Sequence, residues 1–535
     1  MGNNNNNQWW KKTAIYQIYP RSFKDSNNDG IGDLQGITSK LDYLEWLGIK
    51  AIWLSPIYTS PMVDFGYDIS DYVDIDPIFG NLEDFDELIK QAHVRNIKII
   101  MDYVMNHSSD EHAWFKESRT SKDNPKSDWY IWRDPKPDGS PPNNWIAITG
   151  GSAWTYEDKR GQYFLHSFLP CQPDLNWRNP ELKKAMFDVL GFWMDRGVDG
   201  FRVDMISWVM KDEQFRDDPL KEESEINEYT FVQDYERYDH IYSANRPERF
   251  TLLKEFRRFL DTYQEKVSIG EVNYFTPLTE LVKYYGDVNS PLVDIPANFR
   301  FIFLPWKAKK IREFIDNFEG MLGDSFWPNY QLGNHDRPRV VTRIGKEQAR
   351  VAAMLLFTLR GTPFIYNGEE IGMHNVEIPL ELTQDPWKEP GLNRDSLRTP
   401  MQWDESENSG FTKGKPWLPI ASDYQEINVE KERNDPKSFL NLYKNLLQIR
   451  KENLALVVGK YSIHKASNES CFLYKRTYNS TKLIIALNFS DKPQTINIEN
   501  TTTKKIILST YLDRIEEIGT NLNLRPNEGC IINYT

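Results

Sequence analysis

The sequence predicts an α/β protein: a TIM (β/α)8 barrel that carries an inserted domain and a C-terminal antiparallel β-sandwich. Short apolar strands alternate with amphipathic helices over most of the chain, and roughly eight such units can be counted, the number that closes a barrel. Region 107–177, rich in Trp, Pro, Asp and Gly, is too long for an ordinary strand-to-helix connection. From about residue 456 the pattern changes to short β-runs separated by polar turns, which indicates a small sandwich. The barrel should therefore comprise residues 9–106 and 178–455, and the sandwich residues 456–535.

Composition argues against several classes of partner. The chain has 535 residues, of which 39% are hydrophobic, so it can bury more than one core. It carries 65 basic and 78 acidic residues, a net charge of -13, which argues against a nucleic-acid or anionic-membrane partner and fits a neutral or cationic ligand. Its 17 Trp and 27 Tyr side chains offer flat faces that stack on sugar rings, although large α/β cores also use many aromatic residues.

The sequence leaves the location of the protein open. Residues 1–8 contain a run of Asn and are expected to be disordered. No signal peptide is visible, and no apolar run is long enough to span a bilayer. Four Asn-X-Ser/Thr triplets favour a secreted glycoprotein, although such triplets also arise by chance in an Asn-rich chain: Asn468, Asn479, Asn488 and Asn500. The three cysteines show no metal-ligand spacing, and Cys471 and Cys530 could pair in an oxidising compartment.

A polar loop follows the first predicted strand, Ala14–Pro20. Its oxygen-bearing side chains recur at alternate positions, with a Gly for a sharp turn, as in a loop that holds a hard cation. The expected ligands are Asp25, Asn27, Asp29, Asp33 and the main-chain oxygen of Ile31. An EF-hand is excluded because its twelfth position is Gly36 here. The alternative is a polar turn in which Asp33 caps the next helix.

Acidic residues stand at the ends of three predicted strands. Gly200-Phe201-Arg202-Val203-Asp204 reads as a buried parallel strand, in which an Arg and an Asp two positions apart point to the same side. Taken alone, that pair is explained equally well by an internal salt bridge. Glu271 and Asp336 follow two further apolar strands, however, and His107 follows a third. Because barrel enzymes keep their chemistry at one end of the strands, we expect these side chains to meet there.

The remaining elements follow in order. The helix Ile37–Leu47 leads to the strand Ala51–Pro56. The charged segment from Lys211 to about Asn245 has no clean periodicity and is expected to form a helical lid beside the site. The helix Glu347–Leu359 precedes the last barrel strand.

Together these motifs resemble the α-amylase superfamily of glycoside hydrolases (family 13), in its α-glucosidase and maltase branch. They occur in the family's order from Tyr16 to Asp404, and Gln172-Pro173-Asp174-Leu175-Asn176-Trp177 is similar to a marker of the oligosaccharide-cleaving branch. The resemblance implies that region 107–177 is the family's domain B, one wall of a sugar pocket. It also implies a structural Ca²⁺, or Mg²⁺, in the polar loop.

The resemblance implies a role for each strand-end carboxyl group. Asp204, held ionised by Arg202, would be the nucleophile, and the less well paired Glu271 would keep its proton and donate it to the leaving oxygen. Such a pair forms and then hydrolyses a covalent glucosyl-enzyme, with retention of the α configuration. Asp336 would bind glucose hydroxyl groups. Further sugar contacts are implied for Tyr67, Asp68, His107, Phe168, Arg202, His335 and Arg398, whereas Arg394 could be structural.

The implied substrate is a small α-glucoside. A pocket closed by Asp68 and Arg398 recognises a terminal glucose, so we expect exo-cleavage of maltose, malto-oligosaccharides or sucrose. Met205, where relatives carry a smaller residue after the nucleophile, leaves open α-1,4 versus α-1,6 preference and hydrolysis versus glucosyl transfer. The alternative is a catalytically silent binding protein, like the ectodomain of an amino-acid-transporter heavy chain. That class requires a membrane helix and a partner cysteine ahead of the barrel, and this sequence shows neither.

Overall fold

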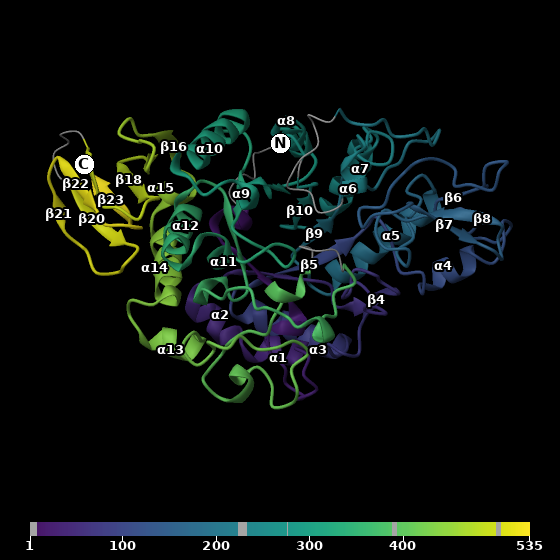
Figure 1. Cartoon of the computed structure of the whole chain (residues 1–535), viewed down its shortest axis with the longest axis horizontal. Coiled ribbons are helices and arrows are strands. Elements are labelled where there is room, and N and C mark those ends of the chain that lie inside the picture. The colour runs from purple at the N-terminus through teal and green to yellow at the C-terminus, as the bar shows by residue number, and fades with distance from the viewer. Residues whose placement is uncertain (1–7, 223–232, 275, 388–392, 499–503, 535) are drawn as a thin grey trace.

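The computed structural model describes the chain except for residues 1–7, 223–232, 275, 388–392, 499–503 and 535. Within the described residues, eight parallel strands form the central barrel (Figure 1): β1 (Ile15–Ile18), β2 (Ala51–Leu54), β5 (Lys98–Val104), β9 (Gly200–Asp204), β10 (Val267–Glu271), β13 (Ile295–Ala297), β14 (Asn329–Gln331) and β15 (Thr362–Tyr366). Their order is β13-β10-β9-β5-β2-β1-β15-β14. At the seam between β13 and β14, the backbone N–H of Asn298, which follows β13, donates to the side chain of Asn329, the first residue of β14, at 3.1 Å. The predicted barrel fold is confirmed.

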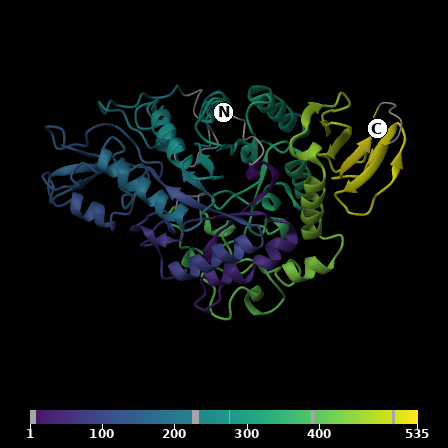
Figure 2. The ribbon, with the colours of Figure 1, turned by 180° about the vertical axis from the view of Figure 1, so that it is seen from behind.

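Helices alternate with these strands and surround them, as the front and back views show (Figures 1 and 2). They include α1 (Leu34–Ser39), α2 (Leu41–Leu47), α3 (Leu82–Val94), α5 (Pro180–Asp195), α7 (Arg249–Leu260), α8 (Leu278–Leu281), α9 (Arg300–Phe303), α10 (Ala308–Leu322), α11 (Val340–Ile344), α12 (Lys346–Thr358), α13 (Val429–Asn434), α14 (Phe439–Glu452) and α15 (Leu454–Val457). The predicted helix Ile37–Leu47 is divided at Lys40. Gly48, with φ of 102°, ends α2 in the left-handed conformation that favours glycine.

The chain leaves the barrel between β5 and α5. This excursion contains α4 (Ala113–Ser118) and an antiparallel sheet in the order β6 (Trp132–Arg133), β8 (Gln162–Leu165), β7 (Trp154–Glu157). An antiparallel bridge between His107 and Asp174 ties its beginning to its end. The excursion and the C-terminal sheet lie at opposite ends of the molecule in both views (Figures 1 and 2). His107 is thereby held at the junction of barrel and excursion.

A second excursion follows β9. Its described part consists of turns and one short helix, α6 (Gln233–Glu236), so the helical lid predicted for this segment is not observed there. Side-chain bonds to the backbone compete with a helix here, because the Asp218 carboxylate accepts from the backbone N–H groups of Tyr242 and Ser243. The segment packs on the first excursion, where the Trp145 indole donates to the Arg216 carbonyl at 2.9 Å.

The C-terminal region is antiparallel. Its main sheet has the order β16 (Lys460–Ile463), β17 (Cys471–Tyr478), β18 (Thr481–Asn488), β23 (Gly529–Tyr534), β20 (Lys504–Ser509), β21 (Glu517–Ile518), and a ribbon pairs β19 (Gln494–Asn497) with β22 (Asn521–Leu524). One face of the sheet, including Phe472 and Ile485, joins the main core of the molecule. Leu522 of the ribbon packs in a separate core with Cys471 and Cys530, both of which are free. The ribbon therefore supplies the second layer expected of a sandwich.

Two further sequence expectations have structural outcomes. The side chain of Asn488 is buried and donates to the carbonyls of Lys492 and Arg525, which closes this triplet to glycosylation in the folded protein. Asn468 and Asn479 are exposed. Asn500 lies outside the described residues, as does most of the Asn-rich stretch 1–8. None of the helices in the described ranges is long and apolar enough for a membrane crossing.

Candidate active site

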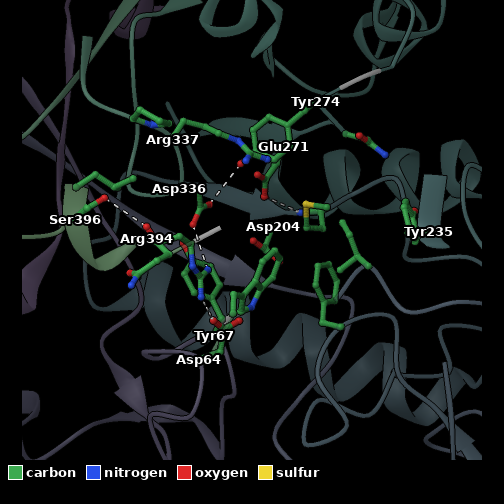
Figure 3. Close-up of a pocket in the computed structure, with 18 of the residues that line it drawn as sticks. Asp64, Tyr67, Asp204, Tyr235, Glu271, Tyr274, Asp336, Arg337, Arg394 and Ser396 are labelled. Carbon is green, nitrogen blue, oxygen red and sulfur yellow. Dashed lines mark hydrogen bonds and ion pairs between the residues drawn. The ribbon is translucent and has the colours of Figure 1, made fainter. Parts of the chain in front are cut away.

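A cavity of about 430 Å³ opens at the carboxyl ends of the barrel strands (Figure 3). Its volume lies in the usual range of small-molecule pockets, about 300–1,000 Å³. Asp204 and Glu271, the last residues of β9 and β10, line it together with Asp336, which follows β14. Carboxyl groups from distant parts of the chain therefore share one cavity, as expected from their positions at strand ends.

Arg202 lies beneath the cavity and binds three carboxyl groups at once. Its Nη1 donates to Asp102 Oδ1 and to Asp204 Oδ1, both at 2.7 Å, and its Nη2 donates to Glu271 Oε2. The backbone N–H of Met205 donates to the same Glu271 oxygen at 3.2 Å. Arg202 does not line the cavity. From this position Arg202 can fix Asp204 and Glu271, the two cavity carboxyls, relative to each other.

Burial has the largest effect on the pKa values of Asp204 and Asp102, two of the carboxyl groups bound to Arg202. It raises the pKa of Asp204 well above its usual range; Arg202 opposes the shift, whereas Glu271 and Asp102 add to it. Burial also raises the pKa of Asp102 to about 6, despite the contact with Arg202. We expected Arg202 to pair with Asp204 and to leave Glu271 poorly paired. The guanidinium instead binds both carboxyls, so Glu271 is as closely paired as Asp204.

Asp64 and Arg394 close one end of the cavity (Figure 3). Arg394 Nη2 donates to Asp64 Oδ1 at 2.7 Å, and Nη1 donates to Asp336 Oδ1 at 3.3 Å. Asp385 binds the same guanidinium from outside the cavity lining. Asp64 lies in the loop between β3 (Tyr58–Thr59) and β4 (Asp71–Ile75), two short strands that pair after β2. This end is thus fixed by charge-assisted hydrogen bonds, and Asp64, Arg394 and Asp385 are nearly fully buried.

Asp68 and Arg398 do not occupy the closing positions expected for them. The Asp68 carboxylate is fully buried and accepts from the N–H groups of Val63 and Asp64 and from the Ser60 hydroxyl. Arg398 lies behind Asp336, to whose Oδ1 it donates at 2.7 Å. Asp64 and Arg394 line the cavity instead, each from the same segment as the residue expected. The sequence cannot distinguish Asp64 from Asp68, or Arg394 from Arg398, because the turn of each loop decides which side chain faces the cavity.

Asp336 lies beside His335 and two guanidinium groups. Burial acts to raise its pKa, but His335, which is charged only at low pH, together with Arg394 and Arg398 outweighs burial and holds the pKa well below its usual range. The group is therefore a carboxylate at neutral pH. Its side chain, which lines the cavity, keeps 19% of its surface exposed, more than His335, Arg394 or Arg398.

Tyr67 lines the cavity and His335 lies behind it. Tyr67 Oη is 2.8 Å from His335 Nε2 and donates to Asp102 Oδ2 at 3.1 Å. The Gln17 amide nitrogen lies 2.7 Å from His335 Nδ1; with the amide donating there, the imidazole proton is assigned to Nε2, facing Tyr67. Burial lowers the pKa of His335 to about 3, so the ring is neutral. His335 therefore orients Tyr67 and does not line the cavity itself.

His107 and Phe168 line the cavity on the side of the first excursion, with ring centroids 4.9 Å apart. Gln172 joins this wall to the closed end: its amide nitrogen is 3.2 Å from His107 Nε2 and donates to Asp64 Oδ2 at 3.2 Å. Burial lowers the pKa of His107 to about 4. The imidazole is accordingly neutral near pH 7 and can exchange hydrogen bonds with a sugar without adding charge.

The loop after β1 carries the predicted cation ligands. The Asp25 carboxylate accepts from three backbone N–H groups of the loop and from the Thr412 hydroxyl. Asp33 accepts from the Gly36 N–H and caps α1, as the polar-turn alternative requires. In the described part of the chain, no three His, Cys, Asp or Glu side chains are grouped so as to hold a metal ion. A cation here would depend on neutral oxygens of Asn27 and Ile31 as well, and calcium binding stays a prediction.

Several residues of the site escaped the sequence reasoning. Asp102 lies behind the cavity lining and joins Tyr67 to Arg202; its position as an acidic residue inside the apolar strand β5 could have identified it. Tyr235 and Trp387 line the cavity itself. Both come from segments without periodicity, so nothing in the pattern around them indicates which way they point.

Comparison with known proteins agrees with this geometry. Residues 17–459 match the family model described as alpha amylase, catalytic domain. The oligo-1,6-glucosidase of Heyndrickxia coagulans is 40% identical, over 97% of this chain and 98% of that protein. A probable alpha-glucosidase of Rhizobium meliloti strain 1021 is 41% identical, over 90% and 89% of the two chains. Among solved structures, the alpha-glucosyl transfer enzyme XgtA gives a TM-score of 0.93 at 38% identity and covers 99% of this chain and 100% of its own.

Proposed function

Because this chain belongs to the alpha-amylase family of glycoside hydrolases, in its α-glucosidase branch, we propose that it is a retaining, exo-acting α-glucosidase. On this proposal it releases the terminal non-reducing glucose from short α-glucosides such as maltose, isomaltose or sucrose. The observation that carries the proposal is the closed end of the cavity, where Asp64 and Arg394 meet. A cavity blocked beside its carboxyl pair has room for a chain end and none for the continuation of a polymer.

Asp204 acts as the nucleophile in this mechanism. Its carboxylate attacks the anomeric carbon while Glu271 donates a proton to the leaving oxygen, and the glycosidic bond breaks. Glu271 then removes a proton from water, which attacks the same carbon and releases Asp204 and glucose. Burial raises the pKa of Asp204, so substrate binding must leave Asp204 ionised for this attack. Arg202 supports this step, because it contacts both carboxyls and can stabilise the charge on either.

A shared guanidinium also favours retention over inversion. Retaining enzymes keep their carboxyls about 5–5.5 Å apart, whereas inverting enzymes need about 6.5–9.5 Å to admit a water molecule between acid and base. One planar group that binds both Asp204 and Glu271 suits the shorter separation. Asp336, ionised and facing the same space, would stabilise positive charge that develops on the sugar ring.

Glucosyl transfer to an acceptor other than water is the second candidate. It is favoured by the apolar character of the wall opposite the closed end, where Phe168, Met205 and Ile148 line the cavity. Such a wall suits an organic acceptor better than water. The similarity to a solved alpha-glucosyl transfer enzyme points the same way.

A substrate panel tests the proposal. Purified protein is incubated with maltose, isomaltose, sucrose and trehalose, glucose release is measured, and proton NMR at early times identifies the anomer released. We expect α-glucose from at least one of the first three sugars. β-Glucose as the first product would reject retention. No glucose from any sugar, with a folded protein and no transfer product, would favour the catalytically silent binding protein.

A further inference from the structure

We propose that Glu236 accepts a hydrogen bond from a hydroxyl group of the leaving sugar, and that Lys221 holds the Glu236 carboxylate in the position where it does so. The inference rests on the proposed α-glucosidase function and names a residue that recognises the second sugar unit. Both residues come from the excursion after β9, which lies outside the strand-end motifs. Glu236 is then a specificity residue, and Lys221 is a positioning residue that acts through it.

Glu236 is the last residue of α6, which borders the cavity opposite to the closed end. Figure 3 shows Arg394, at the closed end, on one side of Asp204 and Glu271. Tyr235, which precedes Glu236 in α6, lies on the other side. A glucose held by the closed end places its anomeric carbon at the two carboxyls. The group that leaves from this carbon must then extend toward α6.

One oxygen of the Glu236 carboxylate is available to a ligand. Oε2 accepts from Lys221 Nζ at 3.1 Å. Oε1 accepts no hydrogen bond from the residues that the structure describes, yet it is not one of the side-chain oxygens sealed inside the protein without a partner. The side chain keeps 11% of its surface exposed, and Glu236 lines the cavity. Oε1 is therefore the accessible oxygen, and a sugar hydroxyl in the cavity can donate to it.

The neighbours of Glu236 leave it as the polar contact that α6 offers to the cavity. Tyr235 also lines the cavity, but its hydroxyl oxygen is buried, so it presents its ring. That ring packs in an apolar cluster with Phe168, Met205 and Trp208. A few polar groups in an apolar lining are the usual means by which a pocket selects its ligand. A carboxylate in such a lining binds a hydroxyl donor more strongly than a neutral acceptor does.

Lys221 restrains the Glu236 carboxylate from outside the cavity lining. The backbone N–H of Lys221 donates to the Arg237 carbonyl oxygen at 2.9 Å, and the preceding residue, Leu220, forms an antiparallel bridge with Tyr238. The two stretches of chain that carry Lys221 and Glu236 are therefore joined by main-chain bonds as well as by the ion pair. Because Lys221 is anchored in this way, its bond to Oε2 holds the carboxylate at the cavity wall with Oε1 left open.

The test compares two substrates with the variant Glu236→Gln, which keeps the size of the side chain and removes its charge. Maltose presents hydroxyl groups on its leaving sugar, whereas phenyl α-glucoside presents none on its leaving group. For maltose we expect kcat/KM to fall about 3- to 10-fold through a higher KM, because an amide binds a hydroxyl less strongly than a carboxylate does. For phenyl α-glucoside we expect no change. Asp234→Asn, which removes the same charge from α6 outside the cavity lining, is the matched control and should leave both substrates unaffected.

A double-mutant cycle tests the positioning role of Lys221. Lys221→Met should raise the KM for maltose by a similar factor in the wild-type background and have little further effect in the Glu236→Gln background, because both changes act on the same contact. Equal losses with both substrates would identify the ion pair as structural and overturn the inference. So would independent effects of the two substitutions, or unchanged kinetics in Glu236→Gln. If the wild-type protein cleaves neither substrate nor any sugar of the panel, the proposed function fails and not this assignment alone.

Discussion

Replacing Asp64 by Asn removes one negative charge from the closed end of the cavity and keeps the shape of the side chain. Asp64 accepts from Arg394 Nη2 at 2.7 Å and from Gln172 Nε2 at 3.2 Å, and it lines the cavity beside Asp336. A hydrogen bond to a charged group contributes about 1.5–3 kcal/mol, which corresponds to roughly 10- to 150-fold in kcat/KM when the bond is lost in the transition state. We expect a loss in this range for maltose.

Asp68→Asn is the matched comparison, because Asp68 comes from the same loop. Burial raises the pKa of Asp68 to about 6, and its carboxylate accepts two backbone N–H bonds and the Ser60 hydroxyl. An amide offers one acceptor oxygen in place of two, so a backbone donor loses its partner, at a cost of about 1–3 kcal/mol in folding free energy. We expect a lower thermal midpoint and a loss in kcat/KM below roughly 10-fold, the lower bound for Asp64→Asn.

The two variants are compared by kcat/KM for maltose and by thermal midpoint at the same pH. The geometry predicts that Asp64→Asn loses activity first and that Asp68→Asn loses stability first. If Asp68→Asn loses as much kcat/KM as Asp64→Asn while its midpoint stays that of the wild type, Asp68 holds the sugar and the assignment of the closed end is refuted.

Three further changes have expected outcomes. Asp204→Asn should lower kcat by more than about 10³-fold, because the nucleophile is lost. It should also raise the thermal midpoint at pH 7, because burial and two neighbouring carboxyls raise the pKa of Asp204, so that its charge destabilises the fold. A lower midpoint would contradict this reasoning. Burial raises the pKa of Glu369 to about 8, against about 4.3 in an unfolded chain. The folding stability should therefore fall as pH rises from about 5 to 8. Glu369→Gln should flatten the dependence of the thermal midpoint on pH over that interval. Calcium should raise the midpoint and a chelator should lower it, with both responses lost in Asp29→Asn; a wild-type midpoint indifferent to both would identify the loop after β1 as a metal-free turn.

The sequence by itself determined the barrel and the carboxyls at its strand ends. A strand has a period of two residues, so the direction of a side chain such as Asp204 follows from the apolar residues around it. The same regularity places Glu271 at the end of β10 and directs both side chains to one face of the barrel. These predictions needed local pattern alone.

Tertiary structure decided which loop residues meet the cavity. Asp64 and Arg394 are 330 positions apart in sequence, and neither stands in a periodic element that would fix its direction. Asp68 and Arg398 have the same chemistry in the same segments, so long-range contacts alone select between them. Long-range contact also brings Glu271 to the guanidinium that sequence reasoning had given to Asp204, because parallel strands distant in the chain lie side by side in the barrel.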